Sequence, residues 1–191
     1  MAEYKYHDQN EDVEKIMISE AELDDIVSRI ASEIDADQAK SGKRLLLVGI
    51  LKGSVVFMSE LMKKIKTPLE IDFMRVSSYG AGTTSSGAIK IGLDLNRDDL
   101  ADLDVIIVED IVDSGRTLKL LTGYLEHKGA KSVRCATLLD KPSRRVVDYN
   151  ADYIGRVIPD EFVVGYGLDF DERYRDLPFV GVLKPEIYAN A

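Results

Sequence analysis

The sequence predicts an α/β fold in which a central, mostly parallel sheet is flanked by helices. Residues 105–108 are four consecutive β-branched residues with no polar alternation, the pattern of a strand buried on both faces of a parallel sheet. Residues 45–51 form a second continuous apolar run, and each run leads through a short turn into residues at helical spacing. This order of strand, turn and helix is typical of domains built on a parallel sheet.

The composition narrows the class of protein. A chain of 191 residues, 45% hydrophobic and 31% charged, fits one globular domain with a substantial core. The net charge of −9 argues against nucleic acid as the main partner, because binding to a phosphate backbone relies on clustered Lys and Arg. The single Cys135 cannot form an intrachain disulfide, and no signal peptide or long apolar span is visible. We therefore expect a cytoplasmic protein without a membrane partner.

The N-terminal segments supply scaffold and one candidate loop. Residues 1–12 are polar and are expected to be poorly ordered, whereas residues 16–18 predict a short strand. Ser19 to Glu22 is a capping box that begins a helix with an apolar face. After the strand at 45–51, Lys52 and Gly53 precede a further helix. They are either a commonplace turn or a cation and an amide presented to a diphosphate.

A long loop of small residues, 77–87, joins the strands predicted at 71–76 and 89–95. Apart from Tyr79, every side chain in it is small, so the loop cannot bury apolar surface to hold itself in place. We expect it to be mobile until something orders it. It is either a passive connection or a lid over a site, and loops of this length in compact domains are usually functional or disordered.

Polar residues gather where the strand at 105–108 ends and the next helix begins. In open α/β sheets this edge is where ligands bind. A helix N-terminus suits a phosphate, whereas adjacent carboxylates suit ribose hydroxyls, Mg²⁺ or a proton that is to be removed. The alternative is that Asp113 or Ser114 is only an N-cap and that the acid pair is solvated. The residues concerned are Glu109, Asp110, Asp113, Ser114, Gly115, Arg116 and Thr117.

The last third predicts another helix, two strands and a second group of candidates. The helix after residue 117 has an apolar face and ends near Gly129, and strands are predicted at 133–139 and 179–183. Lys141 follows the first of these strands. From the sequence alone it is either part of a solvated basic turn or a donor to a carbonyl in the crevice. Phe162 alone is more typical of a core residue than of a stacking platform.

Residues 105–117, Val-Ile-Ile-Val-Glu-Asp-Ile-Val-Asp-Ser-Gly-Arg-Thr, resemble the 5-phosphoribosyl-1-pyrophosphate (PRPP) binding signature of the type I phosphoribosyltransferases, and specifically of the hypoxanthine-guanine branch. The match covers nearly all of residues 13–188. It implies one domain over residues 1–191, with a small hood subdomain formed by the N-terminal segment and roughly residues 157–191, and with the mobile loop at 77–87 as a lid.

The resemblance also implies an activity. Such an enzyme transfers the phosphoribosyl group from PRPP to N9 of hypoxanthine or guanine. Glu109 and Asp110 would hold ribose hydroxyls and the associated Mg²⁺, while Asp113 would act as the general base. The family's pyrophosphate contacts match Leu51, Lys52 and Gly53, with a Leu-Lys peptide bond that is often cis, and also Arg175. The 5′-phosphate would be gripped by Ser114, Gly115, Arg116 and Thr117.

The purine site and the lid are implied in the same way. Lys141 would donate to the 6-oxo group, Phe162 and Val163 would stack and bond the purine, and Asp169 would contribute to this site and reach a second Mg²⁺. Ser78 and Tyr79 match the family's lid pair. A homodimer or homotetramer is expected. A xanthine-preferring transferase and a PRPP-fold regulator that binds nucleic acid are the alternatives. Gly167 and Ser54 depart from common family residues, and we expect neither to affect the chemistry.

Overall fold

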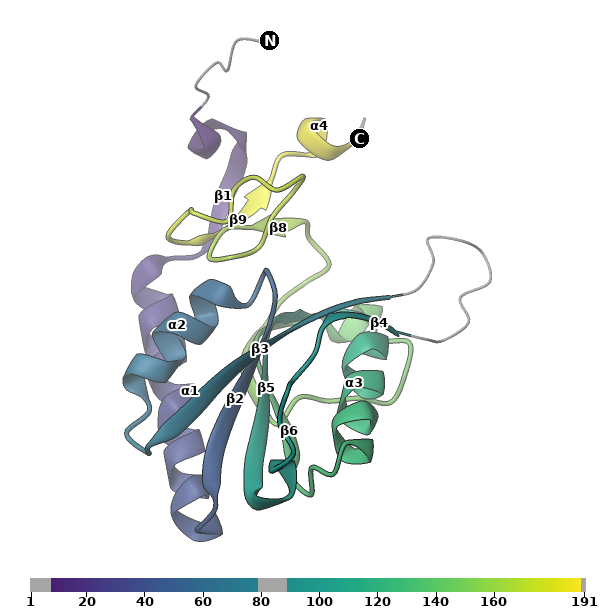
Figure 1. Cartoon of the computed structure of the whole chain (residues 1–191). Coiled ribbons are helices and arrows are strands. Elements are labelled where there is room, and N and C mark those ends of the chain that lie inside the picture. The colour runs from purple at the N-terminus through teal and green to yellow at the C-terminus, as the bar shows by residue number, and fades with distance from the viewer. Residues whose placement is uncertain (1–7, 79–88, 190–191) are drawn as a thin grey trace, which may run out of the picture.

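A six-stranded sheet is the centre of the computed structural model, which describes residues 8–78 and 89–189 (Figure 1). The strand order is β4-β3-β2-β5-β6-β7, and every neighbouring pair is parallel except β3 with β4. The strands are β2 (Arg44–Ile50), β3 (Leu69–Ser78), β4 (Ile89–Leu93), β5 (Leu103–Val112), β6 (Val133–Asp140) and β7 (Tyr153–Val157). The predicted α/β fold with a mostly parallel sheet is confirmed.

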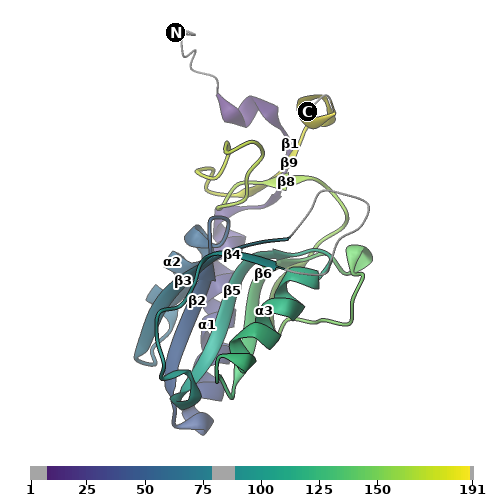
Figure 2. The ribbon, with the colours of Figure 1, turned by 45° about the vertical axis from the view of Figure 1, so that its right-hand side comes forward.

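Helices cover both faces of this sheet, which gives three layers (Figure 2). α1 (Glu20–Ser41) and α2 (Val55–Lys64) pack on one face, and α3 (Arg116–His127) packs on the other. The apolar side chains of β2 and those of residues 103–108 in β5 are buried between these layers. That burial explains why both strands read as unbroken apolar runs in the sequence.

The capping box predicted for the first helix is present. The Ser19 hydroxyl accepts from the backbone N–H of Glu22, and the Glu22 carboxylate accepts from the Ser19 backbone N–H at 2.9 Å. Two helix donors are thereby satisfied, which typically stabilises a helix by about 1 kcal/mol. α1 ends at Ser41, and its C-cap is Gly42, whose φ of 71° is the left-handed conformation common at this position.

β5 is longer than the sequence predicted. We expected the strand to end where the acids begin, but it pairs with β6 through Glu109↔Thr137 and on to Val112↔Asp140. The expectation was wrong because hydrophobic pattern alone does not report backbone pairing with a neighbouring strand. The acids therefore belong to the last residues of β5, and the turn into α3 begins only at Asp113.

A smaller antiparallel sheet lies above the end of the large one (Figure 1). Its order is β1-β9-β8, with β1 (Val13–Ile18), β9 (Val180–Leu183) and β8 (Val163–Val164). Residues 9–12, expected to be poorly ordered, instead form a 3₁₀ turn. The turn is held in place because the Tyr174 hydroxyl donates to Asp12 Oδ2 at 2.7 Å. A final short helix, α4, spans Pro185–Tyr188.

The predicted lid and the expected absence of a membrane span complete the comparison with the sequence. Ser78 is the last residue of β3, and Tyr79 with the remainder of the predicted lid to residue 87 lies outside the described residues. Among the helices of residues 8–78 and 89–189, none is both long and apolar enough to span a membrane.

Candidate active site

The turn between β5 and α3 encloses a small cavity of about 100 Å³. Gly115 has φ 77° and directly precedes Arg116, the first residue of α3, so the backbone N–H groups at the start of this helix face the turn. The Ser114 Oγ accepts from the Arg116 N–H at 3.4 Å. A helix N-terminus of this kind binds anions. The lining is Glu109, Ile111, Val112, Asp113, Ser114, Gly115, Thr117 and Leu118.

Glu109 brings a buried acid to this cavity. Its Oε2 is buried and has no hydrogen-bond partner among the described residues. Burial, followed by the charge of Asp110, raises the pKa of the Glu109 carboxyl well above its usual range. A buried carboxyl oxygen without a hydrogen-bond partner costs free energy. A ligand with hydroxyls, or a cation, would remove that cost.

Asp110 lies against the loop that follows β2. The Leu51–Lys52 peptide bond is cis, as the resemblance implied. A Cβ built on Gly53 would lie 1.6 Å from Asp110 Oδ2, so the loop backbone and the carboxylate are in direct contact. Burial raises the pKa of Asp110 to about 6, although backbone hydrogen bonds and the Arg175 charge oppose the rise.

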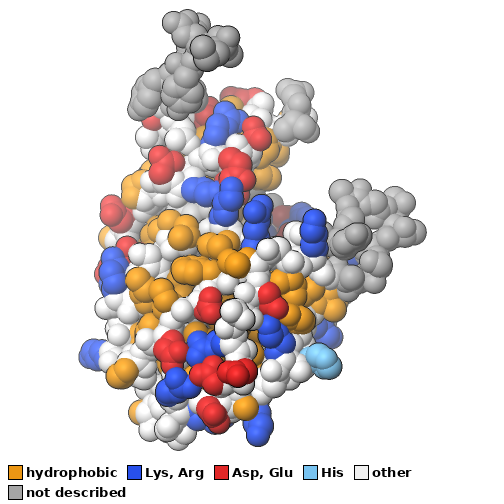
Figure 3. All heavy atoms as spheres, viewed as in Figure 1, with side chains coloured by type: hydrophobic (Ala, Val, Ile, Leu, Met, Phe, Trp, Pro, Cys, Tyr) orange, Lys and Arg blue, Asp and Glu red, His pale blue; other side chains and the backbone are white. Residues whose placement is uncertain are grey.

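Two cations predicted to bind pyrophosphate meet at one carboxylate, that of Glu172. Its Oε2 lies 2.8 Å from Lys52 Nζ and 3.3 Å from Arg175 Nη2. Arg175 also pairs with Asp169 Oδ1 at 2.9 Å, while its Nε is buried and has no hydrogen-bond partner among the described residues. Figure 3 shows Lys and Arg side chains gathered where the small sheet meets the large one. Lys and Arg side chains at the junction of the two sheets would suit the negative charge of a phosphorylated ligand.

Gly167 is part of the same loop contact, contrary to the expectation that it would not matter for the site. Its φ is 102°, and a Cβ at this position would lie 2.1 Å from the Gly53 carbonyl oxygen. The Gly167 carbonyl also accepts from Arg175 Nη1 at 2.8 Å. The residue therefore supports both the Gly53 loop and the arginine, and an alanine here would collide with that loop.

Three of the predicted purine residues, Lys141, Phe162 and Val163, come together where β8 begins, whereas Asp169 pairs with Arg175. Lys141 is buried, which lowers the pKa of its ammonium, and Nζ donates to the Glu161 carbonyl at 2.7 Å. Phe162 follows Glu161 and is 38% exposed, whereas Val163 is buried in β8. The Phe162 ring stacks on Tyr188 with centroids 4.8 Å apart. An exposed aromatic face beside an ammonium is suited to a heterocycle that bears a carbonyl.

Asp113 lines the cavity at the start of α3 and also contacts the segment that follows Lys141. Its Oδ1 accepts from Arg144 Nε at 2.8 Å, and its carbonyl accepts from Arg145. Arg144 reaches Asp160 as well, with Nη1 3.3 Å from Oδ2. Through Arg144, Asp113 is therefore linked to Asp160, which lies close to Lys141. The roles predicted for all these residues remain predictions.

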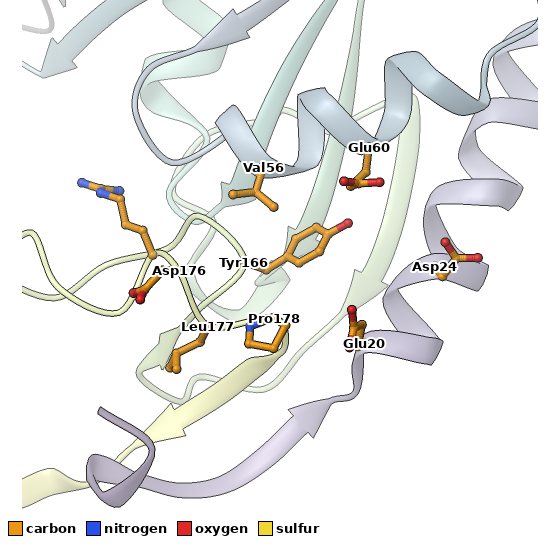
Figure 4. Close-up of a pocket in the computed structure, with 9 residues that line it drawn as sticks. Glu20, Asp24, Val56, Glu60, Tyr166, Asp176, Leu177 and Pro178 are labelled. Carbon is orange, nitrogen blue, oxygen red and sulfur yellow. The ribbon is translucent and has the colours of Figure 1, made fainter. Parts of the chain in front are cut away.

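A second cavity, of about 280 Å³, lies between α1, α2 and the loop after β8 (Figure 4). In Figure 4 the Tyr166 ring lies among the carboxylates of Glu20, Asp24 and Glu60. Of the residues that line this cavity, Arg175 alone belongs to the predicted site. Asp24 pairs with Lys64 at 2.6 Å, so part of the acidic charge here is already neutralised.

The acidic residues fit Mg²⁺ in a particular way. Among residues 8–78 and 89–189, no three His, Cys, Asp or Glu side chains come close enough to form a metal site by themselves. Mg²⁺ commonly takes one or two protein carboxylates and completes its shell with phosphate oxygens and water. The unpartnered oxygen of Glu109 and the raised pKa of Asp110 fit that use, because a bound cation stabilises the ionised carboxylates.

Sequence reasoning missed several residues that the fold brings to this region: Arg144, Arg145, Asp160, Glu172 and Tyr188. Each stands in a turn or near the C-terminus, where charged or aromatic residues usually face solvent. The pair Arg144-Arg145 directly after Pro142-Ser143 carried no periodic signal. Only its folded contact with Asp113 identifies it.

Comparison with known proteins agrees with this geometry. The phosphoribosyl transferase domain model matches residues 15–171. A hypoxanthine-guanine phosphoribosyltransferase from Streptococcus mutans is 51% identical, over 94% of this chain and 98% of that protein. A hypoxanthine phosphoribosyltransferase structure from Staphylococcus aureus is 47% identical with a TM-score of 0.88, and the match covers 94% of this chain and 96% of that one.

A longer relative has the same region. A bifunctional TilS/HprT protein from Listeria innocua is 53% identical over 94% of this chain, but the chain spans only 27% of its length. The matched segment includes the strand, turn and helix start that form the cavity before α3. The family model, the sequence relatives and the solved structures lead to one conclusion: the chain belongs to the phosphoribosyltransferase family, in its hypoxanthine-guanine branch.

Proposed function

We propose that the protein transfers the 5-phosphoribosyl group of PRPP to N9 of hypoxanthine or guanine, releasing pyrophosphate and forming IMP or GMP in purine salvage. The observation that carries this proposal is the cavity at the start of α3. There, a helix N-terminus suited to a phosphate adjoins the buried carboxyl of Glu109, which stands beside Asp110 in the same strand. A phosphate bearing a ribose needs both features side by side.

The residues divide the work by position. Ser114, Gly115, Arg116 and Thr117 hold the 5′-phosphate at the helix start. Glu109 and Asp110 accept hydrogen bonds from the ribose hydroxyls, and their negative charge favours the positive charge that develops on the ribose as pyrophosphate leaves. Leu51, Lys52 and Gly53 with Arg175 bind the pyrophosphate. Lys52 and Arg175 must leave Glu172 to do so, and the pair of Lys52 with Glu172 is exposed on both sides, as ion pairs that break readily are.

Magnesium belongs to this proposal as a cofactor held by Glu109 and Asp110 on the ribose side and by Asp169 at a second position. When bound, Mg²⁺ neutralises the charge of the leaving pyrophosphate. Both acids of the first position must be ionised for this purpose. Their raised pKa values in the ligand-free protein indicate that cation binding and proton release are coupled.

The purine is oriented by Lys141, Phe162 and Val163. The ammonium of Lys141 donates to a 6-oxo group, and Phe162 offers a partly exposed ring for stacking. Adenine has a 6-amino group, which provides Lys141 with no comparable acceptor. Asp113 then accepts the proton that the purine loses when N9 forms its bond to the ribose.

A product assay tests the proposal. Purified protein is incubated with PRPP and Mg²⁺ and with hypoxanthine, guanine, xanthine, adenine or uracil in separate reactions. We expect nucleotide from hypoxanthine and guanine. Conversion of xanthine alone would retain the enzyme class but reject the base preference, and PRPP binding without any product would reject catalysis. We further propose a homodimer or homotetramer acting in the cytoplasm, and sedimentation that shows only monomer would reject the assembly.

A further inference from the structure

Arg144 joins two carboxylates at the purine end of the site. Its Nε donates to Asp113 Oδ1 at 2.8 Å, and its Nη1 lies 3.4 and 3.3 Å from the two oxygens of Asp160. The shorter contact is thus with Asp113, the residue proposed to accept the purine proton. While this contact lasts, Asp113 Oδ1 already accepts a hydrogen bond, so the contact competes with transfer of the purine proton to this oxygen.

Arg144 is far more exposed than the neighbouring arginine, Arg145. Arg145 is 13% exposed and pairs with the buried Asp140 while donating to the Asp113 carbonyl. The Val146 N–H also donates to the Ser114 carbonyl at 3.2 Å. These contacts hold residues 145–146 against the turn between β5 and α3. Arg144, Asp113 and Asp160 are instead about half exposed, and exposed ion pairs are weak and break readily.

Lys141 supplies a reason for Arg144 to move when a purine binds. Its Nζ lies 3.8 Å from Asp160 Oδ1. If Lys141 turns to donate to a 6-oxo group, Asp160 loses that neighbouring cation. Asp160 then attracts Arg144 more strongly, and its oxygens are already within 3.4 Å of the guanidinium. Because Arg144 already contacts both carboxylates, it can pass from Asp113 to Asp160 by rotation of its side chain alone.

We propose that Arg144 is a positioning residue that holds Asp113 in the ligand-free protein and moves to Asp160 when a 6-oxopurine binds. This inference rests on the proposed function. In the reaction, N9 bonds to C1′ of the ribose, the bond from C1′ to the pyrophosphate oxygen breaks with its electron pair, and the purine proton passes to Asp113. Release of Arg144 makes Asp113 a competent base only when the correct substrate is present.

A mutant cycle at Arg144 and Asp160 tests this arrangement. The readout is the single-turnover rate of IMP formation from hypoxanthine by enzyme loaded with PRPP and Mg²⁺, together with hypoxanthine affinity. In D160N the arginine has no carboxylate to move to, so we expect the rate to fall about tenfold with little change in affinity. R144Q is expected to react about threefold faster than wild type, since no fraction of Asp113 remains held. The double variant R144Q/D160N should match R144Q.

The matched control is R156Q, which removes another exposed ion pair, the one between Arg156 and Glu22 at 3.1 Å. It should react like the wild type. A tenfold loss in D160N that persists in R144Q/D160N, or no loss in D160N at all, would overturn the proposal for Arg144 while leaving the enzyme active. If the wild-type protein forms no nucleotide from any base, the proposed function fails and the inference falls with it.

Discussion

The Gly53 backbone and the Asp110 carboxylate occupy adjoining space, because a Cβ at position 53 would lie 1.6 Å from Asp110 Oδ2. The loop after β2 and the acidic end of β5 are therefore fitted to each other without room for a side chain. Real Cβ atoms do not approach so closely, so any larger residue at position 53 must displace the loop or the acid. This contact fixes the relative position of the proposed pyrophosphate and ribose sites.

Gly53→Ala is accordingly expected to damage PRPP use more than folding. A displacement of about 1 Å at a positioning residue typically costs about 100-fold in activity, and we expect a loss of that size in kcat/KM for PRPP. Steady-state kinetics with varied PRPP measure it. Gly123→Ala is the control, because a Cβ at Gly123 in α3 meets nothing within 4 Å. An unchanged kcat/KM in the Gly53 variant would show that the contact is not functional.

Asp113→Asn tests the general base. The amide keeps the shape of the side chain but cannot take a proton, so we expect kcat to fall by about 100-fold to 1000-fold. PRPP affinity should change by less than about threefold, since the phosphate is held mainly by the helix start. Calorimetric titration with PRPP and single-turnover kinetics separate the two effects. Equal losses in affinity and rate would indicate a binding role for Asp113.

The pKa of Asp110 predicts how stability depends on pH. Burial raises this pKa from an ordinary 3.8 to about 6, so the native state binds more protons than the unfolded state between these values. The free energy of unfolding therefore falls as pH rises through this window, by about 1–3 kcal/mol from this group. Asp110→Asn cannot ionise, so its stability should gain on that of the wild type as pH rises from 4 to 6.

Urea unfolding without Mg²⁺ or PRPP, at intervals from pH 4 to pH 8, measures this difference. Parallel curves for the two proteins would contradict the raised pKa. The raised pKa of Asp110 also predicts how ligand affinity depends on pH, and the trend is opposite to that of stability. PRPP with Mg²⁺ requires the ionised acid, so its affinity should weaken as pH falls below about 6.

The sequence predicted those elements whose signal is local. The buried strands within β2 and β5 appear as apolar runs, and the capping box at Ser19 begins α1 as predicted. β7 was missed because Tyr153, Gly155 and Arg156 break its apolar pattern at the edge of the sheet. The extension of β5 beyond residue 108 was missed for a related reason, since it depends on pairing with β6.

In the candidate site, too, the local features could be predicted from the sequence and the long-range contacts could not. Residues 109–117 are contiguous, so their common location at the end of β5 could be inferred from the amino-acid sequence alone. Arg144 reaches Asp113 across a separation of 31 residues, and Lys52 reaches Glu172 across 120. Charged residues in turns usually face solvent, so such pairs leave no trace in composition or periodicity. Long-range pairing of surface charges has to be observed in the folded protein.

Phe162 provides the test of the purine side. Its ring is 38% exposed, stacks on Tyr188 and meets Phe170 edge-on at 5.6 Å, so it is held in place yet accessible. We expect Phe162→Ala to raise KM for hypoxanthine about tenfold, because stacking and apolar contact with the purine are both lost. KM for PRPP should be unchanged, since the Phe162 side chain is absent from the lining of the cavity at α3.

Two conservative variants separate the contributions at this position. Phe162→Tyr keeps an aromatic ring and should bind hypoxanthine nearly as well as the wild type. Phe162→Leu keeps apolar surface without the ring, so it should recover only part of the loss if stacking carries the affinity. Steady-state kinetics with varied hypoxanthine at saturating PRPP decide the matter. Equal KM values for the leucine and tyrosine variants would show that Phe162 acts through apolar contact, and that the purine is oriented by Lys141 and backbone groups instead.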